Sequence, residues 1–586
     1  MNRLAQLIAI GACILPTMFA QAEKEDWKAQ FQKVSDEYFD QVYFPYQPSV
    51  GTAVGYHQYD AELEDYSPTS IDAEIAAFKR FEQRIEAIHP DNAAADLVPR
   101  SDREILLNNI RSSLLALETI RSWEKDPDDY SGTVANAAFV LMERKFAPAD
   151  DRLRSLVARE KKMPALLSEA RVNLKNPPHI YSEIAIEQLP GIIRFFEHDV
   201  PAAFKDATDP ALKTEFAQTN AAVIAALKDY LEWLKTDLLP RSNGDFRIGA
   251  ETFRKKLEYD EMIDIPLPRL LEIGWADLHQ NQAHFIEVAK QLEPDKNPRA
   301  VLEELGADHP APDQLLDTFR STFNGLITFI RAHRIVTIPT EVQPVVEETP
   351  PFMAATTMAS MDTPGPFETH STTAYFNVTL PDPAMTSAET EGFMHSFNVG
   401  TVISTAVHEA YPGHYVQFLW TPKAPSRVRK LLGANTNVEG WAHYCEQMML
   451  DEGYGQPGEG AKDEREARFL RLGQLQDALL RNARFIVGIE MHTGNMTIDQ
   501  AVEFFQKEGY QSKESAEVEA KRGAGDPTYL YYTLGKLEIM KLRDDMRKKQ
   551  GPAFSLEEFH NNFLRQGFPP IKIVREAMLG DDSPAL

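Results

Sequence analysis

Two histidines and a glutamate near residue 410 are the side chains best suited to bind a metal ion and to use it. The segment reads His408-Glu409-Ala410-Tyr411-Pro412-Gly413-His414. One large class of zinc hydrolases carries His-Glu-x-x-His on a helix, because residues four apart share a face and can point two imidazoles at one zinc, while the glutamate serves as general base. The residue types here match that chemistry, but the second histidine comes six residues after the first.

This spacing requires a break in the helix. Six residues turn an unbroken helix by about 600°, which leaves His414 roughly 120° from the face of His408. Pro412 costs about 3 kcal/mol in a helix interior, and Gly413 can adopt backbone angles closed to other residues. We therefore expect a local bulge that returns His414 to the face of His408. A His-Glu pair followed by a nearby histidine also arises by chance, so the motif needs a third ligand.

A third ligand is available 25 residues after the second histidine, in Asn435-Thr436-Asn437-Val438-Glu439-Gly440-Trp441-Ala442-His443-Tyr444-Cys445-Glu446. The asparagines and the threonine are residues that cap helices, and Glu439, His443 and Glu446 then share one helical face. We predict that Glu439 completes a zinc site with the two histidines and that Glu446 holds a ligand histidine from behind. His443 either touches the metal or is a partly buried histidine on the helix face. Manganese or cobalt could replace zinc.

The elements that position these residues are predicted to be mainly helical. From Glu23 to about Ile335, apolar residues recur at three- and four-residue spacing, which indicates amphipathic helices. The clearest helices are expected at residues 71–88, 103–123, 151–174, 219–239 and 312–334. Helices return from Glu389 and run with interruptions to the C-terminus.

A small β-sheet is predicted just before the metal-binding motif. β-branched residues concentrate at 335–338 and 342–346, and residues 374–380 form a third expected strand that ends before Pro381. The Met-, Thr- and Pro-rich segment 350–366 between them cannot be a regular helix. The predicted fold class is therefore mainly α, with a small sheet before the metal-binding helix.

The chain is long enough for two lobes. Its 586 residues exceed what a single hydrophobic core usually serves. We place an N-terminal helical lobe at residues 23–335 and a metal-binding lobe, which includes the small sheet, at residues 336–586.

Residues 1–22 have the basic start, the apolar run and the Ala20-Gln21-Ala22 ending of a secretory signal peptide. The protein is therefore expected in the periplasm or outside the cell. Lipid attachment at Cys13 is a minority alternative, because the residues that follow it stay apolar. No other stretch has the roughly 20 apolar residues of a membrane span.

Charge and cysteine content exclude several classes. The net charge of −27 argues against nucleic acid and anionic membranes as partners. After signal removal Cys445 would be the only cysteine, so no intrachain disulfide is expected.

The motifs resemble a large bacterial family catalogued as a domain of unknown function, whose members carry His-Glu-x-x-Pro-Gly-His followed by Glu-Gly-Trp-Ala. The resemblance covers nearly the whole mature chain, and residues 55–60 and 123–130 look like the family's early landmarks. That family is similar in turn to the gluzincins, which include Taq-type carboxypeptidases, angiotensin-converting enzyme and dipeptidyl peptidase III. The resemblance implies a two-lobed, zincin-like helical fold with zinc at the floor of a channel. The chain departs from the pattern at His443 and Tyr415, and neither change removes a proposed ligand.

The resemblance also suggests residues that handle the substrate. Residues 526–535 are similar to the family's C-terminal Ser-Tyr-Lys-x-Gly motif, with Tyr532 at the tyrosine position. Tyr532 is expected to donate to the oxyanion of the reaction, although Tyr529 and Tyr531 lie close by and all three could be core residues. Arg522 could bind a substrate carboxylate, or it could form a surface ion pair.

The strand at 374–380 could pair with an extended peptide by edge addition, as gluzincin edge strands do. Tyr375 and Asn377 would then contact the substrate.

The expected function is zinc-dependent hydrolysis of peptide bonds in short peptides, with Glu409 as general base. A metal-dependent amidase that cuts cell-wall or other non-protein amides would use the same chemistry. A non-catalytic helical binding protein is the remaining alternative. Glu409 argues against it, because structural zinc sites are normally closed by four protein ligands and need no spare carboxylate.

Overall fold

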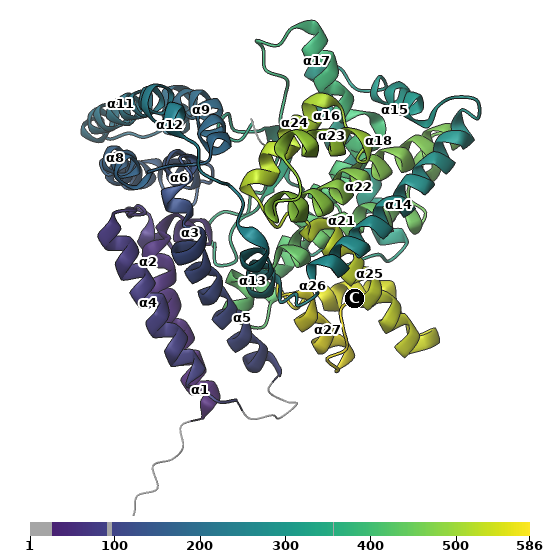
Figure 1. Ribbon diagram of the computed structural model, residues 1–586, viewed down its shortest axis with the longest axis horizontal. Helices are drawn as coiled ribbons and strands as arrows, with labels where there is room; N and C mark the ends of the chain where they lie inside the picture. Colours follow the sequence, from purple (N-terminus) through teal and green to yellow (C-terminus); the bar gives the residue numbers. More distant parts are fainter. Residues whose placement is uncertain (1–25, 91–96, 355–356) are drawn as a thin grey trace, which may run out of the picture.

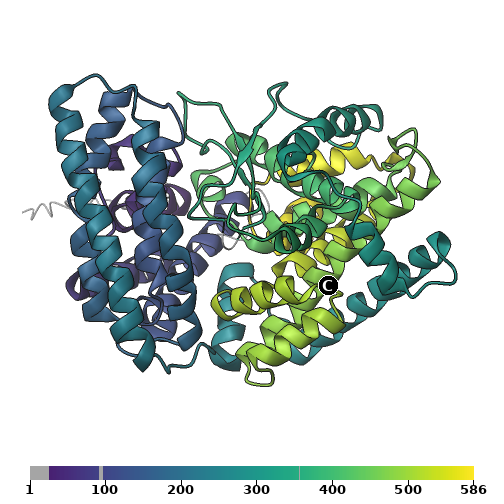
Figure 2. The same cartoon turned by 90° about the horizontal axis from the view of Figure 1, so that it is seen from above.

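The computed structural model describes residues 26–90, 97–354 and 357–586. They form a mainly helical molecule with two lobes, so the predicted fold class is confirmed (Figure 1 and Figure 2). The helices coloured purple to blue gather in one lobe, and the teal, green and yellow helices form the other. The predicted signal peptide and Cys13 lie outside the described residues. Within the described ranges, no helix combines the length and apolar character needed to cross a membrane.

The N-terminal lobe contains two hydrophobic cores. The first joins α1 (Trp27–Tyr38), α4 (Pro68–Glu86) and α5 (Leu97–Leu114). The second joins α6 (Asp128–Met142), α7 (Ala149–Glu160), α8 (Met163–Asn173), α9 (His179–Arg194) and α11 (Pro210–Trp233). The predicted helices occur here, but the one expected at 151–174 is two helices, because Pro164 starts a new helix in its first turn.

The C-terminal lobe is built on long helices that lie side by side in pairs. α14 (Leu267–Leu292) packs along α22 (Glu464–His492), and α21 (Asn435–Asp451) packs along α25 (Tyr531–Gln550). A Cβ on Gly440 of α21 would lie 2.6 Å from the Cα of Gly535 on α25. Glycine at both positions lets the two backbones touch, which brings the region of Tyr532 close to Glu439.

The remaining elements of this lobe are shorter. They are α13 (Gly249–Glu261), α15 (Pro298–Gly306), α16 (Leu315–Ala332), α17 (Ser387–Met394), α18 (Val399–Glu409), α19 (His414–Trp420), α20 (Arg427–Leu431), α23 (Ile498–Lys507), α24 (Lys513–Gly525), α26 (Leu556–Leu564) and α27 (Ile571–Leu579).

α14 to α16 lie before the lobe boundary predicted at residue 335, yet they share hydrophobic cores with helices from late in the chain. α13, which follows α12 (Leu239–Arg241), packs against α5 of the N-terminal lobe and against α21 and α22. Leu278 and Phe285 pack with Leu472 and Leu479. The change in composition near residue 336 therefore marks a change from helix to sheet inside one lobe.

The sheet has three strands, β1 (Val345–Glu348), β2 (Ala359–Asp362) and β3 (Tyr375–Val378). β3 lies in the centre, parallel to β1 and antiparallel to β2. The strand predicted at 374–380 is confirmed, and the one predicted at 342–346 overlaps β1. Residues 335–338 form no strand; Ile335 and Val336 are instead buried in the main core. β2 was not predicted, because its sequence Ala-Ser-Met-Asp has no β-branched residue.

Candidate metal centre

The two histidines of the motif lie on separate helices. α18 ends at Glu409 and α19 begins at His414, with four residues looped out between them. Gly413 N donates to Val407 O (3.0 Å), which folds the loop back onto α18. A Cβ on Gly413 would lie only 1.8 Å from His408 O, so this close approach is what requires glycine. The predicted break is confirmed, but it separates two helices and does not bulge a single one.

A tryptophan on α21 holds this loop from the other side. Trp441 is fully buried, and its Nε1–H donates to Pro412 O at 3.0 Å. Its ring stacks on Phe563. This hydrogen bond therefore connects α21, which carries Glu439, to the loop that precedes His414.

The structure brings His408, His414 and Glu439 together. Glu439 Oε2 lies 3.3 Å from His408 Nε2 and 3.4 Å from His414 Nε2. Zinc with ligand bonds of about 2.0–2.2 Å and tetrahedral angles places its ligand atoms roughly 3.3–3.6 Å apart. Glu439 Oε2 is buried and makes no hydrogen bond of good geometry. Two imidazole nitrogens and a carboxylate oxygen at this spacing fit a divalent transition metal.

Glu409 lies in the same group of side chains as the two histidines. One ligand atom each of His408, Glu409 and His414 falls within 4.8 Å of the others. The Glu409 side chain is buried. It forms none of the hydrogen bonds or ion pairs found among the described residues. The site thus holds a carboxylate beyond those that the ligand set needs.

Glu446 supports the site from behind, as predicted. Its carboxylate lies 2.7 Å from His408 Nδ1, 3.1 Å from His443 Nδ1 and 3.2 Å from a guanidinium nitrogen of Arg481. Burial raises the pKa of Glu446, but Arg481 and the two histidines outweigh it and hold the pKa well below its ordinary value. His443 contacts Glu446 from one turn away on α21. His443 is fully buried, so it is not a partly exposed histidine of the helix face, and its Nδ1 faces Glu446.

Charge around the histidines is strongly negative. Burial lowers the pKa of His408, but Glu439 and Glu446 outweigh it and raise the value to about 9. Burial lowers the pKa of His443 to about 4. Neutral His443 can therefore donate its Nδ1–H to Glu446 without adding charge.

Tyr532 and Arg522 lie together beside the site. Arg522 donates to the Tyr532 hydroxyl at 2.9 Å, and the Tyr532 ring is near-parallel to that of His408, with centroids 6.3 Å apart. Burial, followed by the charge of Glu439, raises the pKa of Tyr532. Tyr531 instead donates to Asp526 (2.6 Å). Tyr532 thus differs from Tyr531 in lying against His408. Arg522 has the Tyr532 hydroxyl as a hydrogen-bond partner, in place of the surface ion pair or the substrate carboxylate that were expected.

Sequence reasoning missed two arginines of α22. Arg481 and Arg484 lie over the Tyr532 ring, at 5.7 and 4.9 Å from its centroid. Glu519 neutralises Arg484 through two bonds of 2.6 and 2.7 Å. No motif surrounds either arginine, so only the packing of α22 could reveal them.

The prediction that the 374–380 strand offers a free edge is wrong. β3 is hydrogen-bonded on both sides. Tyr375 donates to Glu143 O (3.3 Å), and Asn377 is buried, with its amide 3.4 Å from Ser360 Oγ. β2 is an edge strand, and it packs against α18 and α19.

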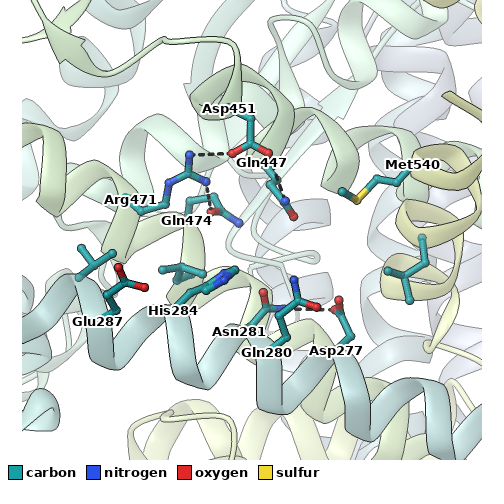
Figure 3. Close-up of a pocket in the computed structure, with 13 residues that line it drawn as sticks. Asp277, Gln280, Asn281, His284, Glu287, Gln447, Asp451, Arg471, Gln474 and Met540 are labelled. Carbon is teal, nitrogen blue, oxygen red and sulfur yellow. Dashed lines mark hydrogen bonds and ion pairs between the residues drawn. The ribbon is translucent and has the colours of Figure 1, made fainter. Parts of the chain in front are cut away.

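A cavity of about 470 Å³ lies on another side of α21 (Figure 3). Helices α14, α21 and α22 contribute most of its polar side chains, α25 contributes the apolar Leu537 and Met540, and Arg471 binds Asp451 (2.8 Å) across it. None of the proposed ligands lines this cavity.

Comparisons with known proteins show the fold and the family of this chain. No curated protein matches the chain. A solved structure of a candidate lipoprotein of unknown function from Shewanella oneidensis is similar at a TM-score of 0.75 and 27% identity, and covers 94% of this chain and 99% of its own. A candidate lipoprotein from Colwellia psychrerythraea shares the fold at a TM-score of 0.77, 17% identity and the same coverage. The model of the family described as "Bacterial protein of unknown function (DUF885)" matches residues 48–578, so the chain belongs to that family.

Proposed function

We propose that the protein is a zinc-dependent hydrolase that cleaves peptide bonds of short peptides. The observation that carries this proposal is a carboxylate, Glu409, beside a three-residue ligand set. Zinc held by His408, His414 and Glu439 would supply a Lewis acid and would lower the pKa of a coordinated water towards about 7. A purely structural zinc site would not need the additional carboxylate of Glu409.

The protein's own groups divide the remaining work. Glu409 is placed to take a proton from the attacking water and to pass it to the leaving amine. The Tyr532 hydroxyl is placed to donate to the oxygen that becomes negative, with Arg522 holding the phenol in position. Glu446 fixes the ring of His408, so that Nε2 points at Glu439.

Substrate binding is assigned to β2 in place of β3. β2 has one unpaired edge and lies against the helices of the two histidines. An extended peptide could add to this edge through backbone hydrogen bonds. Support for the gluzincin relationship comes from the lengthened His-Glu motif followed by Glu-Gly-Trp-Ala. Hydrolysis of cell-wall or other non-protein amides remains the second candidate for the substrate.

We also propose that the protein is exported. The predicted signal at residues 1–22 supports this, and so do the similar proteins from Shewanella oneidensis and Colwellia psychrerythraea, which are described as candidate lipoproteins. The same two proteins support lipid attachment at Cys13 as the alternative to cleavage after Ala22.

Glu409→Gln tests the proposal directly. The variant should retain the zinc content of the wild type and lose at least about 10³-fold in hydrolysis of a mixed peptide library, because the general base is gone. His414→Ala should lose one zinc per chain together with the activity. Full activity of Glu409→Gln, or equal zinc in wild type and His414→Ala, would exclude this site as the catalytic centre. Muropeptides in the same assay separate peptidase from amidase.

A further inference from the structure

A second cluster of metal-binding side chains lies outside the candidate catalytic site. It consists of His309, in the loop after α15, Glu391 on α17 and His395 directly after α17. Glu391 Oε1 lies 3.3 Å from His309 Nε2 and 3.7 Å from His395 Nε2. These spacings resemble the 3.3 and 3.4 Å around Glu439.

The rings are oriented as metal ligands require. His309 Nδ1 lies 2.9 Å from Pro310 O, and since a carbonyl only accepts, Nδ1 carries the proton. Nε2 is the ring nitrogen that faces Glu391, so it is the nitrogen available to a metal ion. A hydrogen bond of this kind from the second ring nitrogen to a backbone carbonyl is a common way to orient a metal-binding histidine. Glu391 and His395 are four residues apart, so one helical turn presents both.

The cluster joins two segments next to the start of α18. Asp308 O accepts from Val399 N (3.0 Å), and Val399 is the first residue of α18. Asn398, three residues after His395, caps that helix through the N–H groups of Gly400 and Thr401. His408 lies about 15 Å further along the axis, ten residues at 1.5 Å each.

We infer that His309, Glu391 and His395 form a second transition-metal site, which binds Zn²⁺ or a similar ion and ties α17 to the loop before α16. With three protein ligands and an exposed Glu391, the site leaves room for water as a fourth ligand. The bound ion would brace the end of α18 opposite the candidate catalytic site. The inference does not depend on the proposed function.

Zinc titration of full-length variants tests the site. Calorimetry and elemental analysis should find two Zn²⁺ per wild-type chain and one in His414→Ala. In the His414→Ala background, either His395→Ala or His309→Ala should remove the remaining ion. Excess Zn²⁺ should also raise the Tm of His414→Ala by a few degrees, as a ligand at about 100 times its Kd does, and should leave the Tm of the double variants unchanged.

His179→Ala is the matched control. His179 and Glu183 form an exposed i,i+4 pair at 3.3 Å and belong to no three-residue cluster among the described residues, so this change should remove no ion. Equal zinc in His414→Ala and in both double variants would overturn the second site. Two ions in His414→Ala and one in the His414→Ala, His395→Ala double variant would instead contradict the catalytic assignment and support the second site.

Discussion

Two buried carboxyl groups, Glu160 in the N-terminal lobe and Glu446 in the C-terminal lobe, have opposite surroundings. In the N-terminal lobe, Arg159 is fully buried and donates only to neutral oxygens, of Ala137 (2.7 Å), Thr52 (2.8 Å) and Tyr59 (3.2 Å). The adjacent Glu160 accepts a hydrogen bond from a threonine hydroxyl, and burial raises its pKa to about 8. At neutral pH this carboxyl is therefore mostly protonated.

Glu446 in the C-terminal lobe has charged partners instead. Glu446 lies among Arg481 and two histidines, and Lys536 binds Asp277 at 3.1 Å. Glu446 and Glu160 are equally inaccessible, yet their pKa values shift in opposite directions. Burial alone makes a carboxyl neutral, and surrounding cations keep it ionised where a metal-binding histidine needs it.

The largest expected effect follows from removing the paired carboxylate. Glu446→Ala removes the nearer carboxylate partner of Arg481 and leaves only Asp477 at 3.5 Å, which should lower the free energy of unfolding by about 3 kcal/mol. It also frees His408 Nδ1, which should weaken zinc binding by about 10–100-fold. Chemical denaturation of chelator-treated protein and competition with a zinc chelator measure the two effects separately.

Leu153→Ala is the control in the other lobe. Leu153 is fully buried in the N-terminal core, so its truncation should cost a similar 2–5 kcal/mol. Zinc affinity should stay at the wild-type value. If it falls as far as in Glu446→Ala, general loss of stability explains both results, and the special role of Glu446 is lost.

A smaller effect is expected from the hydroxyl that Arg522 orients. Tyr532→Phe should reduce kcat by about 10²-fold with little change in KM or Tm, because one donor to the developing oxyanion is removed. Tyr531→Phe loses a hydrogen bond to Asp526 instead and should cost less than about tenfold. Equal losses in the two variants would show that neither hydroxyl has the assigned role.

A last effect concerns Glu160 and depends on pH. Its folded-state pKa of about 8 exceeds the ordinary value of 4.5, so between these values the folded state binds more protons than the unfolded state, and stability falls as pH rises. Relative to wild type, Glu160→Gln should gain about 3 kcal/mol at pH 8 over its value at pH 5. Urea denaturation at both pH values measures this. Exposed Glu215→Gln should show no such difference, and an identical trend there would refute the assignment.

The proposed ligands could be predicted because they lie in two short segments whose spacing helix geometry interprets. His408, His414, Glu439 and Glu446 all come from residues 408–446. Loop length and one proline were enough to place the break between the first two.

What could not be predicted depends on contacts between distant segments. Arg481 reaches Glu446 only because α22 crosses α18 and α21. The central position of β3 could not be predicted, because it depends on pairing with β2, whose sequence does not indicate a strand. The core that α14 shares with late helices could not be predicted either, because Leu278 and Phe285 are covered by residues nearly 200 positions later.

The bond between Trp441 and Pro412 has a kinetic consequence. It fastens the helix of Glu439 to the loop before His414, so the three proposed ligands can separate only if α21 and that loop part. Parting them breaks a buried hydrogen bond and the stacking of Trp441 on Phe563. A metal ion bound there would be released mainly when this contact opens. Its residence time would therefore depend on the free energy needed to separate α21 from the loop, as well as on the strength of its coordination bonds.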